Sequence, residues 1–433
     1  MSEKFKLGLT RNRLFEFDNC VCFLGKITEK FDVIKCQRAF KTLLLKEPVL
    51  TCGVELCENG DAFLVTGAKE PCLEFYQGDE QTFVDKMKAD GLDYREKLFS
   101  FVIINDNTLG IFAHTVVADV RALMYLADEF VNVYKTEVVS VVPLEIIVLS
   151  EVSQLPSNVL SVVIDKLSSE LDVGWQKKTK VFNYSDYENA RKKYISTKQE
   201  HGSIAFEVDK NTLCNLKSFA YKEKVDVSSL VAFAFYESLT KFVGGKRKYR
   251  KLNVQANERV FFPDGYKMQI GAYNGVVTVG KTKNKNTPAT IENTAKEFHR
   301  EIYKRVTSAF TTFYNEFLLM RLPASFTDSQ YMYCAGEFHH KYSKKLAEVY
   351  GCANEVAGEF CSYNLNQKIW NNLSFFDTVI LSEPLKMRST TMITFVENEA
   401  SATICFEYKK DRISNETAQN IVENVVDLLK IFK

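Results

Sequence analysis

Apolar residues in the first third of the chain follow two different periods, and each period predicts its own kind of element. The spans 32–46 and 120–134 carry apolar residues at helical spacing, and Glu47-Pro48 ends the first of these helices because proline disfavours a helical residue before it. Short apolar runs separated by polar turns predict strands at the following positions: 19–26, 49–56, 62–66, 98–104 and 109–113. The last four of these strands are expected to form two hairpins.

The second half of the chain repeats this alternation. A strand is predicted at 202–208 and a strongly apolar helix at 227–243. Further strands are expected at 252–255, 275–279, 378–381, 391–396 and 401–408, and long helices at 291–317 and 415–432. The span 135–199 lacks a clear period, and we interpret it as a crossover. Strand-then-helix order in both halves predicts an α/β (α+β) fold, and 433 residues suffice for two lobes, 1–175 and 176–433.

Composition and charge narrow the range of partners. Lys and Arg total 56 against 55 Asp and Glu, and nucleic-acid binders usually carry a basic excess, so we expect no nucleic-acid partner. The longest apolar stretch is interrupted and too short to cross a bilayer, so no membrane span is expected. No apolar segment follows a basic start, which favours a cytoplasmic protein without a signal peptide. The eleven cysteines contain no CxxC pair, and we expect no metal site.

Common catalytic and nucleotide-binding motifs are absent, since the chain has no GxGxxG, GxxxxGK[ST], HExxH or GxSxG sequence. The strongest candidate for chemistry is His114, which follows the strand 109–113. Asp119 stands where the helix 120–134 begins, a good N-cap position. A histidine held this way would be a rigidly mounted general base. The same pattern also fits a core histidine beside an ordinary helix cap, and local pattern alone leaves both interpretations open.

The segment 114–120, with the sequence HTVVADV, resembles the HHxxxDG motif of the CoA- and carrier-protein-dependent acyltransferases. That superfamily includes the condensation domains of nonribosomal peptide synthetases and chloramphenicol acetyltransferase. Three weaker matches lie in the expected order along the chain, at 39–55, at 257–259 with 270–274, and at 362–366. Together the four matches extend over nearly the whole sequence.

This resemblance implies a V of two chloramphenicol-acetyltransferase-like lobes with a central channel. It implies transfer of an acyl group from a thioester of CoA or of a phosphopantetheinyl carrier protein to a small alcohol or amine, with no permanently bound cofactor. In the family the motif aspartate is structural and pairs with an arginine of the second lobe. Here Asp119 would pair with Arg259, and Asn274, part of the second-lobe signature, would support the site.

The segment departs from the family motif at the catalytic position. Aligned on Asp119, the place of the second, catalytic histidine is taken by Thr115, whose hydroxyl has no useful basicity near neutral pH. Neighbouring strand residues point to opposite faces, so two alternatives stay open. If the turn before Asp119 holds one extra residue relative to the family motif, His114 faces the channel and is the base. We prefer this alternative. If Asp119 keeps the same spacing as in the family motif, Thr115 faces the channel instead. The chain is then a slow enzyme or an inactive protein that binds an acyl carrier or ligand.

Overall fold

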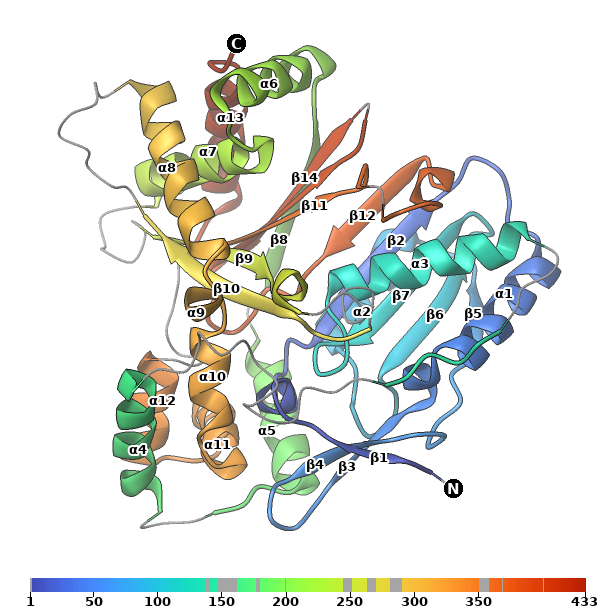
Figure 1. Cartoon of the computed structure of the whole chain (residues 1–433), viewed down its shortest axis with the longest axis vertical. Helices are drawn as coiled ribbons and strands as arrows, with labels where there is room; N and C mark the ends of the chain where they lie inside the picture. Colours follow the sequence, from blue (N-terminus) through green and yellow to red (C-terminus); the bar gives the residue numbers. More distant parts are fainter. Residues whose placement is uncertain are drawn as a thin grey trace.

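The computed structural model describes residues 2–136, 141–146, 162–176, 180–198, 200–243, 251–262, 270–280, 290–349, 358–367, 369–399 and 401–433. Within these ranges the chain forms three β-sheets, two large and one small, which are flanked by helices (Figure 1). The two large sheets splay apart and lie in different lobes.

The first large sheet is built mostly from the N-terminal part of the chain. Its strands, in order across the sheet, are β12 (Thr378–Ser382), β2 (Cys20–Lys26), β7 (Thr108–His114), β6 (Phe99–Ile104) and β5 (Leu73–Tyr76). Helices α1 (Val33–Lys46) and α3 (Val120–Lys135) cover one face, and α2 (Glu80–Asp90) packs through Val84 on the other. β12 comes from the far end of the chain and pairs antiparallel with β2.

A small sheet lies beside this lobe, in the order β1 (Lys4–Lys6), β4 (Ala62–Val65) and β3 (Gly53–Leu56). β3 and β4 are antiparallel partners, as the predicted hairpin requires. Leu64 of β4 belongs to the same apolar core as helices α1 and α3.

The second large sheet carries the C-terminal lobe. Its strands, in order, are β10 (Asn274–Val279), β9 (Leu252–Asn257), β11 (Glu359–Asn364), β13 (Thr391–Glu397), β14 (Ala402–Lys409) and β8 (His201–Val208). Four helices share an apolar core with this sheet: α6 (Lys210–Glu223), α7 (Val227–Phe242), α8 (Ile291–Val306) and α13 (Asn415–Leu429). This core is distinct from the one beneath α1 and α3.

Shorter helices gather at the base of the two lobes, where Figure 1 shows α4, α5, α10, α11 and α12 close together. Their bounds are α4 (Val162–Trp175), α5 (Tyr184–Thr197), α9 (Ala309–Thr312), α10 (Tyr314–Met320), α11 (Ala324–Cys334) and α12 (Lys341–Val349). Trp175 of α4 stacks on Phe326 of α11, with ring centroids 4.9 Å apart. In the described ranges no helix is long and apolar enough to cross a membrane.

Most predicted strands and the longest apolar helices match the structure, and the α/β fold class is confirmed. The single helix predicted at 291–317 is wrong, because the chain breaks there into α8, α9 and α10. Ser308 caps a new helix by accepting a hydrogen bond from the backbone N–H of Thr311. The described part of the span 135–199, interpreted as a crossover with helical patches, contains α4 and α5. The division into lobes at 175/176 stays a prediction.

Candidate active site

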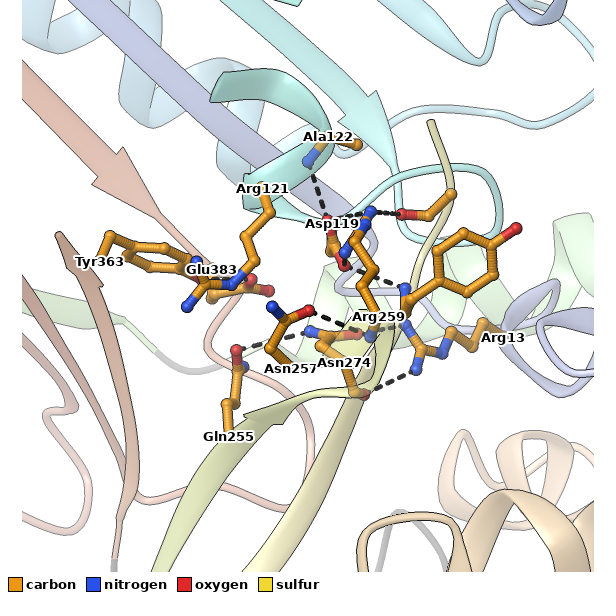
Figure 2. A network of polar contacts seen from close by, with 12 residues as sticks. Arg13, Asp119, Arg121, Ala122, Gln255, Asn257, Arg259, Asn274, Tyr363 and Glu383 are labelled. Atoms are coloured by element: carbon orange, nitrogen blue, oxygen red, sulfur yellow. Dashed lines mark hydrogen bonds and ion pairs between the residues drawn. The ribbon is translucent and has the colours of Figure 1, made fainter. Parts of the chain in front are cut away.

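An ion pair joins the start of α3 to the second large sheet. Asp119 is the N-cap of α3 and accepts a hydrogen bond of 2.9 Å from the backbone N–H of Ala122. Arg259 lies in the short helix Glu258–Phe261 after β9, and its two terminal nitrogens donate to the Asp119 carboxylate at 2.6 and 3.0 Å (Figure 2). The backbone N–H of Tyr273 donates to the same carboxylate at 2.9 Å.

This ion pair is almost completely buried, with side-chain exposures of 3% for Asp119 and 6% for Arg259. Burial alone would raise the pKa of Asp119, but the Arg259 cation and the hydrogen bonds to the carboxylate outweigh burial and lower it. Arg259 also donates to the carbonyl oxygen of Gly271 at 2.7 Å. With its carboxylate fully engaged, Asp119 holds two parts of the chain together and is not placed to move a proton.

His114 points into the interior of the N-terminal lobe. It is the last residue of β7, it is fully buried, and its Nδ1 accepts a hydrogen bond of 3.0 Å from the backbone N–H of Val116. Its Nε2 has no hydrogen-bond partner among the described residues. Burial, with a smaller contribution from the Arg191 cation, lowers the pKa of His114 to about 3, so the imidazole is neutral at physiological pH.

Thr115 has the opposite orientation. Its hydroxyl donates a hydrogen bond of 3.0 Å to Oε2 of Glu16, and its backbone N–H donates to the carbonyl oxygen of Asn19 at 2.8 Å. Glu16 follows the short helix Arg11–Arg13 and lines a cavity, whereas His114 is not among the residues that line it. Of the two adjacent motif residues, Thr115 is therefore the one that hydrogen-bonds a residue of the cavity wall.

The cavity lies where residues 12–18, β10, α10, α11 and the segment 386–388 after β12 meet. Its charged lining residues are Arg13, Glu16, Asp18, Glu316, Lys386 and Arg388. Asn274 also lines it, and its side-chain and backbone oxygens accept hydrogen bonds from Arg13 at 2.7 and 3.1 Å (Figure 2). Asn274 thus fixes the Arg13 guanidinium in the cavity wall.

Burial raises the pKa of two carboxyl groups near Arg13. Burial raises the pKa of Glu316, and it raises the pKa of Glu258 further because Glu316 adds a like charge. Neither oxygen of Glu258 has a hydrogen-bond partner in the described part of the chain. Burial thus favours the protonated form of both carboxyls relative to exposed ones.

A second polar cluster lies on the other side of the Asp119–Arg259 pair. The hydroxyl of Tyr363 donates to Glu383 at 2.9 Å, and the Arg121 guanidinium lies over the Tyr363 ring at 5.3 Å (Figure 2). Burial raises the pKa of Glu383. Tyr363 belongs to the segment 362–366 that resembles the family, so this match lies beside the ion pair.

A larger cavity adjoins the first, with which it shares Met387 and Arg388. It has a volume of about 510 Å³. Other basic residues in its lining are Lys198, His201, His339, Lys409 and Arg412, against a single lining carboxylate, Asp411. Burial lowers the pKa of His201 to about 4, so the positive charge comes from the lysines and arginines.

The structure therefore brings Asp119, Arg259 and Asn274 together. It buries His114 at the end of β7 and places Thr115, the next residue, against Glu16. Sequence reasoning did not find Arg13 and Glu16. They lie about 100 residues before the motif, in a short segment without a recognisable pattern, and only the tertiary fold brings them to Thr115.

No protein-family model matches the sequence, and no curated protein matches it. Solved structures match over nearly the full length. The condensation domain from monacolin K polyketide synthase MokA has a TM-score of 0.63 and 9% identity, covering 99% of this chain and 97% of its own. The first condensation domain of the CDA synthetase has a TM-score of 0.63 and 12% identity, with the same two coverages.

Trichothecene 15-O-acetyltransferase from Fusarium sporotrichioides is also similar, with a TM-score of 0.64 and 9% identity over 100% of this chain and 96% of that protein. At these identities the likeness concerns the fold. The chain thus has the two-lobed fold of condensation domains and of this acetyltransferase, which confirms the fold that the motif segments predict.

Proposed function

We propose that this chain transfers an acyl group from a thioester of CoA or of a phosphopantetheinyl carrier to a small alcohol or amine. The observation that supports this proposal is the polar cavity beside the Asp119–Arg259 pair, whose lining residue Glu16 accepts a hydrogen bond from Thr115 of the motif segment. In the superfamily that the sequence resembles, acyl transfer takes place in the channel at this motif. The reaction needs no permanently bound cofactor.

The larger neighbouring cavity supports a phosphate-bearing donor. The side chains of Lys198, Lys409 and Arg412 line it, and cations in a concave site favour anionic ligands such as the phosphates of CoA or phosphopantetheine. Arg388, shared by both cavities, would lie between the phosphate and the thioester. An acyl or peptidyl carrier protein is the corresponding macromolecular partner, and the cytoplasm, where CoA is abundant, is the proposed location.

A second candidate function is binding without catalysis. It is favoured by one observation: the motif residue hydrogen-bonded to the cavity-lining Glu16 is a threonine, while the imidazole of His114 is fully buried. Loss of a general base costs about 10²–10⁴ in rate, so binding and positioning would remain without efficient turnover.

A thiol-release assay separates the two functions. The full chain is incubated with short-chain acyl-CoAs and a panel of alcohols and amines, and acylated products are identified by mass spectrometry. Turnover supports acyl transfer. Activity lost in His114→Ala but kept in Thr115→Ala would make His114 the base. If the wild type binds acyl-CoA without turnover, and Thr115→His gains activity, the second candidate is correct.

A further inference from the structure

We propose that the Glu16 carboxylate accepts the proton of the attacking alcohol or amine, and that Thr115 is a positioning residue that orients this carboxylate. This inference rests on the acyl transfer proposed above. It assigns the base to a residue outside the motif segment, on a different part of the chain.

The geometry at Thr115 carries the inference. The Thr115 hydroxyl donates to Oε2 of Glu16 at 3.0 Å, so the carboxylate stands directly in front of the position where the family motif has its catalytic histidine. The other oxygen, Oε1, lies 4.0 Å from the Lys386 ammonium, beyond hydrogen-bond distance. Both Glu16 and Lys386 line the cavity. One carboxylate oxygen is thus fixed by the threonine, and the other is left to accept a proton.

The other charged groups in the cavity wall are less suited to this role. Asp18 forms an ion pair with Lys198 at 2.7 Å and accepts a hydrogen bond from the Tyr194 hydroxyl, so its oxygens are engaged. Glu316 is fully buried, which raises its pKa and favours its protonated form. The side chains of Arg13, Lys386 and Arg388 are cations and have no lone pair with which to accept a proton.

The step conserves atoms and charge. The oxygen or nitrogen of the acceptor attacks the thioester carbonyl carbon, and its proton passes to the Glu16 carboxylate. The new C–O or C–N bond forms, the tetrahedral intermediate collapses, and the C–S bond breaks. The proton on Glu16 then passes to the leaving thiolate, which departs as the free thiol, and the carboxylate is regenerated. No oxidant, reductant or metal takes part.

Steady-state kinetics of the full chain test this assignment with the acyl-CoA and acceptor that give turnover. Glu16→Gln keeps the shape and removes the charge, and we expect kcat to fall by about 10²–10⁴ with the KM for acyl-CoA changed little. Thr115→Val should lower kcat about tenfold, because one orienting hydrogen bond is lost. Glu55→Gln, which removes the same charge at an exposed ion pair with Lys4, is the matched control and should retain wild-type kcat.

A chemical-rescue experiment separates proton transfer from a structural role. Glu16→Ala leaves space in the cavity, and added formate should restore part of its kcat, whereas formate should not raise kcat in Glu16→Gln, where the side chain fills that space. Urea denaturation confirms that each variant is folded.

The possible failures are distinguishable. If Glu16→Gln turns over at the wild-type rate and His114→Gln does not turn over, the role of Glu16 is overturned and His114 is the base. Accumulation of an acyl group on Thr115, seen by intact-mass spectrometry, would overturn the direct attack by the acceptor. Absence of turnover in the wild type with every donor and acceptor would reject the acyl transfer itself, and the role of Glu16 with it.

Discussion

Residues 114 and 115 show how much two adjacent side chains can differ in environment. Neighbouring side chains at the end of a strand point to opposite faces, and this could be predicted from the sequence. The sequence could not settle which one lies next to the cavity-lining Glu16, because the neighbouring residues Ala113 and Val116 are both apolar. The orientation becomes visible only when Glu16 is brought to Thr115 by the fold.

The buried imidazole makes a prediction about stability and pH. In the unfolded chain His114 has an ordinary pKa near 6.5, whereas burial lowers the value in the folded protein to about 3. Between these values the unfolded state holds a proton that the folded state lacks, so stability falls as the pH drops, by about 1.4 kcal/mol per pH unit. The glutamine of His114→Gln does not titrate, so this pH-dependent loss of stability is absent from the variant. Urea denaturation at pH 7, 6 and 5 should show the wild type losing stability relative to the variant, and a constant difference would contradict this account.

The Asp119–Arg259 pair makes a second prediction at this scale. Arg259→Met leaves the Asp119 carboxylate buried without its cation, and we expect a loss of about 3–5 kcal/mol in the free energy of unfolding. The matched control is Lys4→Met, which breaks a surface pair with Glu55 in which both side chains are about half exposed. The control should cost at most about 1 kcal/mol. Equal losses in the two variants would show that the buried pair has no special role.

At the scale of elements, the sequence predicts well where one face of a helix is apolar. α1, α3, α7 and α13 lie close to the predicted positions. By contrast, α11 buries polar residues such as Thr327, Asp328 and Gln330, so no apolar stripe marks it in the sequence. The Asp328 carboxylate is bound by Arg11, 317 positions away, whereas the Thr327 hydroxyl donates to the carbonyl oxygen of Ala324 in the same helix.

The packing of β2 against the segment just before β12 leads to a prediction about an element. A Cβ on Gly25 would lie 2.5–2.8 Å from the ring of Phe376, just before β12. Gly25→Ala should therefore destabilise the protein by about 1–3 kcal/mol, because the ring has to move out of a filled core. Hydrogen exchange should also accelerate in β12. In the double variant with Phe376→Ala the alanine at position 25 should cost much less, and additive losses would contradict the predicted clash.

At the scale of the whole molecule, the two lobes are not separate in sequence. The first large sheet includes β12, residues 378–382. Buried ion pairs also join the N-terminal segment of the chain to residues much later in the sequence. Arg11 pairs with Asp328 at 2.8 Å, and Asp18 pairs with Lys198 at 2.7 Å. The apolar residues of β12 predict a strand, but they do not predict its partner. No local sequence pattern indicates that β12 pairs with β2.

This interdependence predicts how a fragment behaves. Residues 1–175, the first lobe as divided by sequence, should not fold alone, since the edge of β2 would lose its partner strand and Phe23 would lose Phe376. Arg11 would also lose the Asp328 carboxylate. Far-UV circular dichroism and a two-dimensional amide NMR spectrum should show a largely unfolded fragment, and co-expression with 176–433 should restore dispersion. A well-dispersed spectrum of the fragment alone would mean that β12 and the ion pairs align the two lobes but are not needed to fold the first.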